Sequence, residues 1–167
     1  MNVCETYDFI VIGGGSAGYA AARTANELGA KVAVVDDAEE LGGLCILRGC
    51  MPSKTLIYSA EVLHLAQQGQ VFGFKDQKTR ADLAAMQQRK KEIIAEFADY
   101  RSGQLQDGRF SLYRSKAKFV DQNSIEFTDG KTIKGDRFVL ATGSQIAMPP
   151  VPGLDQVSFK TSDEVLE

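Results

Sequence analysis

Compact apolar runs alternate with a helical pattern in the first part of the chain. Residues 7–12 and 31–35 are short, mostly apolar and rich in β-branched side chains, which is typical of buried strands. Between them, from Ser16 to Leu28, small and apolar residues recur at helical spacing, and Gly29 suits a helix end. A strand, a helix and a strand within about 30 residues predict a βαβ unit whose two strands are parallel.

The middle of the chain predicts two more helices. We expect a glycine- and cysteine-bearing loop at residues 41–51 and then a helix at 52–68, because a proline suits a first helical turn. After a connector at 69–79, the pattern predicts a long amphipathic helix at 81–106, with the basic run Arg89–Lys91 on its solvated side. The side chains expected on its buried side are Leu83, Met86, Ile93, Ile94, Phe97 and Leu105.

Short strands follow the long helix. They are predicted at residues 110–114, 117–120, 124–128, 132–134 and 138–141. Asp129-Gly130 is a two-residue hairpin signal, and the proline-bearing tail at 145–153 is typical of extended chain. Together these patterns predict an α/β fold with a parallel sheet, crossover helices and a small antiparallel β-meander near residues 115–135.

The composition narrows the class of protein. A formal net charge of −3 disfavours nucleic acid and anionic membrane surfaces as partners. No apolar run approaches the roughly 18 residues that a membrane-spanning helix needs, and no basic-then-apolar leader opens the chain, so we expect a cytoplasmic protein without membrane association. With one histidine and three cysteines, we expect neither a histidine-rich metal site nor a disulfide scaffold.

A glycine-rich turn joins the first strand to the first helix. Residues 13–18 fit GxGxxG: Gly13 permits the tight turn, Gly15 lets a pyrophosphate approach, and Gly18 lets the helix pack closely on the strand. Ser16 opens a helix whose free N–H groups favour an anion. The position of the motif between strand and helix predicts a Rossmann-type dinucleotide-binding turn; a glycine-rich turn of another α/β fold is the alternative.

An acidic residue closes the second predicted strand. Asp36 follows Val35 where the ribose of a dinucleotide needs a hydrogen-bond acceptor, and its charge would repel a 2′-phosphate. Asp37 is the alternative acid. The full set of strand, glycine turn, helix, strand and acid is more specific than the glycine pattern alone.

Two cysteines lie close together in the predicted loop after this unit. A disulfide between Cys45 and Cys50 would contribute only about 2 kcal/mol in the chain-entropy model, which is little for a structural crosslink. Cys50 precedes the helix expected from Pro52, where the helix dipole lowers a thiol pKa, so we expect Cys50 to have the lower pKa of the two. The pair suits reversible disulfide exchange. Two structural thiols or half of a metal site are the alternatives, and no further ligands support the metal site.

The run from Gly42 to Lys54 resembles the active-site signature of the FAD-dependent pyridine nucleotide–disulfide oxidoreductases, which include dihydrolipoamide dehydrogenase, glutathione reductase and mercuric reductase. The order of motifs is also similar: GxGxxG, an acid after the second strand, two cysteines spaced CxxxxC, and Ala141-Thr142-Gly143 on a buried strand. The similarity covers the whole chain, and CxxxxC is its most specific part. One departure is Leu44, where the family usually has a threonine that helps to bind FAD.

The resemblance implies a role for each motif residue. Cys45 would be the thiol that attacks the substrate disulfide, Cys50 the thiol beside the flavin, and Lys54 a cation near flavin N5. Asp36 would bind the adenosine ribose, and Ala117 would contact adenine through its backbone. The residues implied in FAD binding are Gly13, Gly15, Ser16, Gly18, Asp36, Gly43, Lys54, Ala117, Ala141, Thr142 and Gly143.

The resemblance also implies a function. Residues 1–167 would form the first segment of the FAD-binding domain of an oxidoreductase, without the family's NAD(P)H and interface domains. Electrons would pass from NAD(P)H through FAD and the Cys45–Cys50 pair to a small-molecule disulfide, most like dihydrolipoamide dehydrogenase. A mercuric reductase-like enzyme and a non-catalytic nucleotide-binding fragment are the alternatives. The full-length enzyme would be a homodimer, whereas the isolated chain is expected to be inactive and to self-associate through exposed apolar surface.

Overall fold

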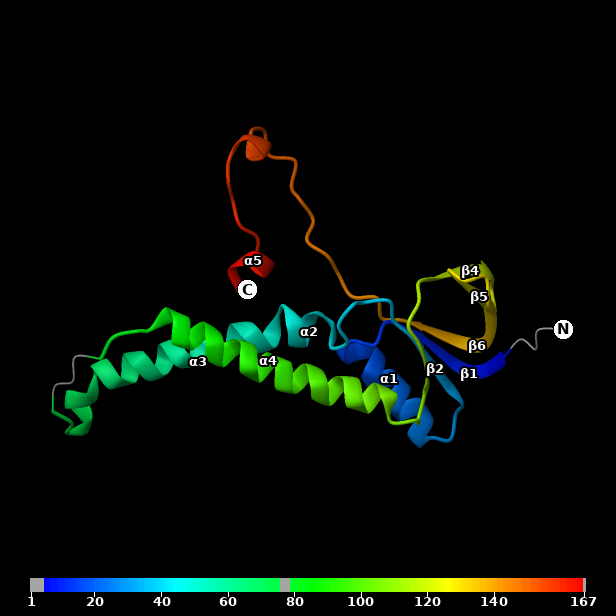
Figure 1. Ribbon diagram of the computed structural model, residues 1–167, viewed down its shortest axis with the longest axis horizontal. Coiled ribbons are helices and arrows are strands. Elements are labelled where there is room, and N and C mark those ends of the chain that lie inside the picture. The colour runs from blue at the N-terminus through cyan, green and yellow to red at the C-terminus, as the bar shows by residue number, and fades with distance from the viewer. Residues whose placement is uncertain (1–4, 76–78, 167) are drawn as a thin grey trace. The chain divides into compact units, whose positions relative to one another are not determined.

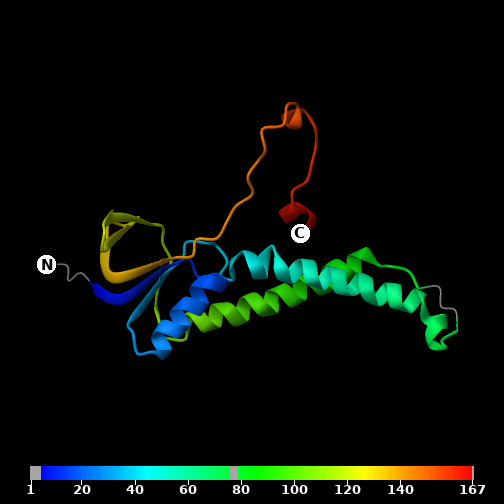
Figure 2. The same cartoon turned by 180° about the vertical axis from the view of Figure 1, so that it is seen from behind.

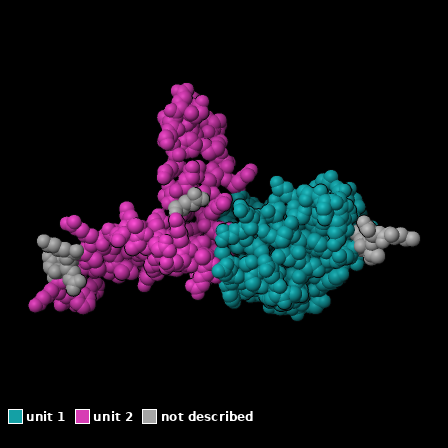
Figure 3. Space-filling model, in the orientation of Figure 1, with its two compact units in different colours: residues 1–44, 98–144 teal, residues 45–97, 145–167 magenta. Residues whose placement is uncertain are grey.

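The computed structural model describes residues 5–75 and 79–166, and the chain divides into two compact units (Figure 3). Unit 1 consists of residues 1–44 and 98–144, and unit 2 consists of residues 45–97 and 145–167. The glycine turn therefore belongs to unit 1, whereas Cys45 and Cys50 belong to unit 2.

Unit 1 is built on a six-stranded sheet with the order β3-β2-β1-β6-β5-β4 (Figure 1). In chain order, β1 to β6 span Glu5–Ile12, Val32–Val35, Ser111–Tyr113, Ala117–Asp121, Ser124–Phe127 and Thr132–Leu140. Strands β3, β2, β1 and β6 run parallel, while β6, β5 and β4 form an antiparallel meander. The predicted α/β fold with a parallel sheet and a small meander is confirmed.

The predicted βαβ unit is present at the start of this sheet. α1 (Ser16–Glu27) connects β1 to β2 and packs against both, as both views show (Figures 1 and 2). The two strands pair in parallel register, with Ile10 opposite Ala33. The chain leaves the helix through Gly29, whose φ of +88° lies in the left-handed region that favours glycine after a helix.

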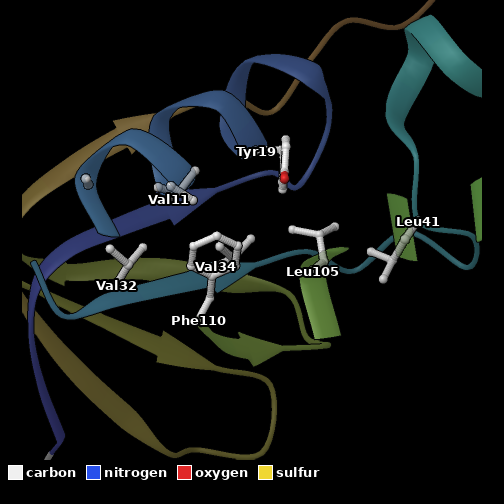
Figure 4. Close-up of a cluster of buried hydrophobic side chains, with 9 residues drawn as sticks. Val11, Tyr19, Val32, Val34, Leu41, Leu105 and Phe110 are labelled. Carbon is white, nitrogen blue, oxygen red and sulfur yellow. The ribbon is translucent and has the colours of Figure 1, made fainter. Parts of the chain in front are cut away.

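The buried residues of β1 and β2 serve two hydrophobic cores, and those of β2 do so in strict alternation. One core joins the two strands to α1, to residues 41 and 110 and to the end of the helix α4 (Leu83–Gln106); its buried members are Val11, Tyr19, Ala22, Ala25, Val32, Val34, Leu41, Leu105 and Phe110 (Figure 4). The other joins the strands to the meander; its buried members are Tyr7, Ile10, Ala33, Val35, Ile125, Phe127 and Ile133. Because both faces are covered where these strands pair, the paired stretches Phe9–Ile12 and Val32–Val35 are continuously apolar.

The strand β6 corrects the prediction of separate strands at 132–134 and 138–141. Thr132–Leu140 is one continuous strand that pairs with β5 at its start and with β1 along its length. Gly135 lies inside it because a Cβ at this position would come within 2.8 Å of the Ile10 side chain. This glycine therefore marks a close approach between strands rather than a turn. The turn between β5 and β6 contains Gly130, with φ +81°.

Unit 2 carries the cysteine-bearing segment. α2 (Gly43–Leu47) and α3 (Cys50–Gln67) occupy most of the stretch predicted as a loop at 41–51, which corrects that prediction. α2 is too short to show a helical period in the sequence, and it buries a single apolar side chain, that of Ile46. Pro52 lies in the first turn of α3, where a backbone N–H has no intrahelical partner to lose.

The helix α4 is confirmed, but part of its predicted burial is wrong. Leu83 is 71% exposed and Phe97 42% exposed, whereas Leu105 is fully buried. Lys90, predicted on the solvated side, is only 4% exposed, because its ammonium donates to the carbonyl of Leu166. The helical period of α4 carries no information about a covering segment 76 residues further along the chain.

The remaining short elements of unit 2 are η1 (Gly69–Phe72) in the predicted connector, and η2 (Leu154–Gln156) and α5 (Ser162–Leu166) in the tail. Residues 145–153 form neither helix nor strand, which fits the extended tail predicted there, whereas Ala141, predicted as the end of a strand, lies just after β6. Apolar side chains of the tail are largely exposed, including Met148, Val151 and Val157. None of the helices in the described residues is long and apolar enough to cross a membrane.

Candidate functional site

The glycine turn of unit 1 has the tight geometry that its sequence predicted. Gly13 has φ +104°, and its N–H donates to the carbonyl of Val35 over 2.7 Å. A Cβ at Gly13 would lie 2.2 Å from the carbonyl oxygen of Ala141, and a Cβ at Gly18 would lie 1.7 Å from the carbonyl oxygen of Gly13. Neither position can hold a side chain without moving the backbone. Gly13 and Gly18 thus fix how β1, α1 and the end of β6 meet.

A second pair of glycines brings the chain after β2 against this turn. Gly43 has φ +72°, and a Cβ there would lie 2.6 Å from the Cα of Gly15. Gly15 is the N-cap residue of α1 and has no side chain to cap the helix, and Ser16, the next residue, is exposed. The first N–H groups of α1 therefore receive no side-chain cap, which is the arrangement that binds a phosphate at a helix N-terminus.

Asp36 lies beside the same turn. Its Oδ2 accepts a hydrogen bond of 2.6 Å from the N–H of Gly14, and its Oδ1 accepts one of 2.8 Å from the N–H of Ala38. The side chain is 12% exposed, so the carboxylate lies at the edge of the turn. Each oxygen retains acceptor capacity for a ribose hydroxyl. The neighbouring Asp37 is exposed and has neither of these contacts.

The Ala141-Thr142-Gly143 segment reaches the turn through its backbone. The N–H of Ala141 donates to the carbonyl of Ile12 over 2.8 Å, which carries the β1–β6 pairing up to the glycines. Gly143 has φ +76°, and Thr142 is exposed. The structure thus brings residues 141–142 together with Gly13.

Ala117 lies elsewhere in unit 1. It starts β4, opposite Phe127 in β5, and lines an open pocket of about 410 Å³. The other lining residues are Lys116, Lys118, Glu126, Phe127, Thr128 and Gly130. None of the glycine-turn residues lines this pocket, so the geometry does not join Ala117 to the turn.

In unit 2, the two predicted redox cysteines lie in contact as free thiols. Cys45 is partly buried in α2, and Cys50 is exposed at the first residue of α3. The hydrogen bond to the Cys45 sulfur and the charge of a Cys45 thiolate raise the pKa of Cys50, and burial adds to the increase. A backbone N–H and the charge of Lys54 act in the opposite direction but are smaller. The helix N-terminus was expected to give Cys50 the lower pKa of the two thiols. In this dithiol form the pKa of Cys50 is raised instead, because the neighbouring sulfur outweighs the helix N-terminus.

Lys54 and Ser53 lie one turn further along α3. Lys54 is exposed, and its charge lowers the pKa of Cys50. The hydroxyl of Ser53 donates to the carbonyls of Gly49, over 2.7 Å, and Cys50, over 3.1 Å. These bonds fix the turn that carries the Cys50 thiol. Sequence reasoning assigned no role to Ser53, although a serine three residues after a helix start is a common source of such bonds.

Arg114 is the other residue that sequence reasoning missed. It follows β3, and its Nη2 donates to the carbonyls of Ala38 and Glu39. Its Nη1 lies 3.9 Å from Oδ1 of Asp36. The sequence did contain a signal that could have identified Arg114: it is a basic residue at the carboxyl end of a predicted strand, and parallel sheets bind ligands at this edge.

The fold and these features define a class: an α/β protein with a Rossmann-type glycine turn and a pair of free thiols in contact. The chain matches the family described as pyridine nucleotide-disulphide oxidoreductase over residues 7–166, and it belongs to that family. It is 37% identical over 162 residues to a mercuric reductase of Bacillus cereus, a match that covers 96% of this chain and 25% of that protein. It is 33% identical over 173 residues to a dihydrolipoyl dehydrogenase of Bacillus subtilis (strain 168), covering 96% of this chain and 36% of that one.

A solved structure supports the same assignment. The Cu(II) complex of the HOCl-induced flavoprotein disulfide reductase RclA from Escherichia coli superposes with a TM-score of 0.74 at 27% identity, covering 95% of this chain and 33% of that one. The chain therefore spans between 25% and 36% of the length of these relatives. The family is named for pyridine nucleotide and disulphide chemistry, and RclA is a flavoprotein.

Proposed function

We propose that this chain is the FAD-binding and dithiol-carrying part of an NAD(P)H-dependent disulfide reductase of the dihydrolipoamide dehydrogenase type. The observation that carries the proposal is the contact between the free thiols of Cys45 and Cys50 at the start of α3. The enzyme acts on a small-molecule disulfide, as a cytoplasmic homodimer.

The glycine turn fits FAD on an observation independent of the family. Gly15 leaves the N-terminus of α1 without a side-chain cap, and any Cβ at Gly43 would fill the space beside it. Gly13, Gly15, Ser16 and Gly18 would hold the pyrophosphate, with Gly43, Ala141, Thr142 and Gly143 around the turn and Asp36 at the ribose. The further contact of adenine with Ala117 remains part of the proposal. Bound FAD would supply two-electron transfer between the pyridine nucleotide and the dithiol.

The dithiol performs the exchange with substrate. Two electrons and two protons convert the Cys45–Cys50 disulfide to two thiols. The Cys45 thiolate then attacks a substrate disulfide, forming a mixed disulfide and releasing one substrate thiol. The Cys50 thiolate attacks the Cys45 sulfur, re-forming the Cys45–Cys50 disulfide and releasing the second thiol. Lys54 favours the Cys50 thiolate through its charge.

FAD binding tests the glycine-turn assignment. The purified chain is titrated with FAD, and binding is followed by quenching of flavin fluorescence. Since a hydrogen bond to a charged acceptor is worth about 1.5–3 kcal/mol, Asp36→Ala should weaken FAD binding roughly ten- to hundred-fold. Asp37→Ala is the matched control and should have little effect, because Asp37 is exposed and has no contact with the turn. Tighter binding of NADP⁺ than of FAD contradicts the assignment.

Thiol chemistry tests the dithiol assignment. In a Cys4→Ser background, the reduced chain should show two reactive thiols and the oxidised chain none, and a reducing agent should restore both. Peptide mapping should identify a Cys45–Cys50 bond. Two thiols that stay reduced under an oxidised glutathione buffer indicate structural cysteines instead.

Mercuric ion reduction is the second candidate, because the mercuric reductase of Bacillus cereus is 37% identical to the chain. Activity assays on the full-length enzyme that contains this chain distinguish the two candidate functions. Oxidation of dihydrolipoamide with NAD⁺, without NADPH-dependent loss of Hg(II), supports the first. The reverse pattern supports the second.

A further inference from the structure

A loop without helix or strand, residues 36–40, carries Asp36 away from β2. The far end of the loop is anchored by Leu41, which is buried in the hydrophobic core that includes α1. Beside the loop lies a pocket of about 200 Å³, lined by residues 39–41, by residues of α4 and by Arg114. Residues 37–40 are exposed, so polar contacts rather than burial fix the middle of the loop.

The guanidinium of Arg114 supplies such contacts. Its Nη2 donates to the carbonyls of Ala38 and Glu39, the latter over 3.2 Å, and its Nη1 faces Oδ1 of Asp36 at 3.9 Å. The same Oδ1 accepts the N–H of Ala38, so Asp36 holds the N–H and Arg114 the carbonyl of one residue. A planar fork with several fixed donors can make these contacts together, which a lysine ammonium cannot reproduce.

We propose that Arg114 is a positioning residue for the adenosine end of the cofactor site, acting through Asp36. Arg114 holds residues 36–40 so that Oδ2 of Asp36 remains bonded to the N–H of Gly14 and the carboxylate faces the bound ribose. The proposal rests on the proposed function, since it assigns Asp36 to FAD. The new element is that Arg114 sets how tightly the site binds FAD.

A double-mutant cycle on FAD affinity tests this role. Arg114→Gln should weaken FAD binding by roughly tenfold, because it removes charge-assisted hydrogen bonds that order the loop. If Arg114 acts through Asp36, the same change in an Asp36→Ala background should weaken binding less than about twofold. Arg114→Lys, which keeps the charge but loses the fork, should fall between wild type and Arg114→Gln.

Arg109→Gln is the matched control. The Arg109 side chain is 37% exposed and that of Arg114 is 38% exposed, and Arg109 also belongs to unit 1, where it pairs with Asp107 over 2.6 Å. This variant should bind FAD as wild type does. Urea unfolding of the FAD-free variants separates a loss of affinity from a loss of fold, and if Arg114→Gln does not fold, the cycle is run with Arg114→Lys.

The outcomes are distinct. Equal losses from the Arg114 substitution with and without Asp36 overturn the proposal, and so does wild-type affinity in Arg114→Gln. A loss as large in Arg109→Gln shows a general structural effect and also overturns it. If the wild-type chain does not bind FAD, the proposed function fails, whatever the Arg114 variants do.

Discussion

Unit 1 and unit 2 differ in how they bury their apolar residues. Two buried clusters hold unit 1 together, and all their members lie in residues 1–44 and 98–144. In the described part of unit 2, Ile46 and Pro52 are the buried apolar side chains, and the other buried residues include Thr55 and Lys90. Helices of unit 2 instead expose large apolar side chains: Ile57, Tyr58, Val62, Leu65, Val71, Phe72 and Leu83.

This difference separates two kinds of functional group. The glycine turn and Asp36 are fixed by a packed sheet, which suits a site that must hold a cofactor in one geometry. Cys45 and Cys50 lie in short-range structure, stabilised by local bonds such as those of Ser53. The exposed apolar faces of unit 2 are of the kind that pack against another protein surface. We therefore expect substitutions in unit 1 to act through the fold, and those in unit 2 to act mainly on thiol chemistry.

The largest effect is expected at the glycine turn. Gly18→Ala places a Cβ 1.7 Å from the carbonyl oxygen of Gly13, so β1 and α1 must separate. The free energy of unfolding should fall by more than about 4 kcal/mol, since the clash is with backbone and has no local relief. Urea unfolding, followed by circular dichroism, measures it.

Gly103→Ala is the matched control, because Gly103 is also a helical glycine of unit 1 but its Cβ would meet no atom within 4 Å. This change should stabilise the protein by about 0.5–1 kcal/mol, the gain from replacing a mid-helix glycine. Equal effects at Gly18 and Gly103 would show that the turn is not sterically determined.

The second effect compares two leucines on one helix. Leu105→Ala, in the unit 1 part of α4, should cost about 3 kcal/mol of unfolding free energy, because the side chain is fully buried. Leu83→Ala, in the unit 2 part, should cost less than about 0.5 kcal/mol, because that side chain is 71% exposed. Similar costs would mean that Leu83 is covered in solution, and that the contrast between the units does not extend along α4.

Much of unit 1 could be predicted because its signals are local. The apolar runs of β1 and β2, the glycine turn and Asp36 lie within 32 residues, from Glu5 to Asp36, and each has a period or a motif of its own. The single strand β6 could not be predicted as one element, because Gly135 looks like a break until Ile10 is seen against it. The role of Arg114 depends on a contact with residues more than 70 positions away, for which a single sequence has no pattern.

The burial of side chains in unit 2 was harder to predict, because it also depends on contacts between residues far apart in the sequence. The period of α4 placed Leu83 and Phe97 on a buried face that no described segment covers completely, and it placed Lys90 in solvent although α5 covers it. The motif CxxxxC identified the thiol pair but not its electrostatics. The helix N-terminus was visible in the sequence, whereas the contact between the two sulfurs, which decides the direction of the Cys50 pKa, was not.

The next effect is a change in the pKa of Cys50 in unit 2, which we expect without a large change in the free energy of unfolding. In a Cys4→Ser background, Cys45→Ala removes the hydrogen bond and the charge that raise the pKa of Cys50, so this pKa should fall. Lys54→Met removes a cation and should raise it. The pH dependence of carboxymethylation of Cys50 measures both. An unchanged or higher Cys50 pKa in Cys45→Ala would show that the sulfur contact is not its main cause.

The smallest effect is a pH dependence carried by unit 1. The Glu5 carboxylate accepts hydrogen bonds from Tyr7 Oη over 2.7 Å, from Tyr113 Oη over 3.1 Å and from Lys131 Nζ over 3.1 Å. These bonds lower the pKa of Glu5 from its ordinary value of 4.5 to about 2, and the bond from Tyr7 has the largest effect. Since the folded-state pKa is the lower one, the stabilisation is fully present above about pH 4.5 and is lost as the pH falls toward 2.

Glu5→Gln should therefore be less stable than wild type at pH 6, and the difference should shrink as the pH is lowered from 4.5 to about 2, because glutamine does not titrate. Tyr113→Phe, which removes one of the three donors, should give an intermediate slope. Urea midpoints measured at several pH values decide it. Parallel curves for wild type and Glu5→Gln across this window would show that Glu5 keeps an ordinary pKa in the folded chain, and that the contacts of Glu5 do not persist in solution.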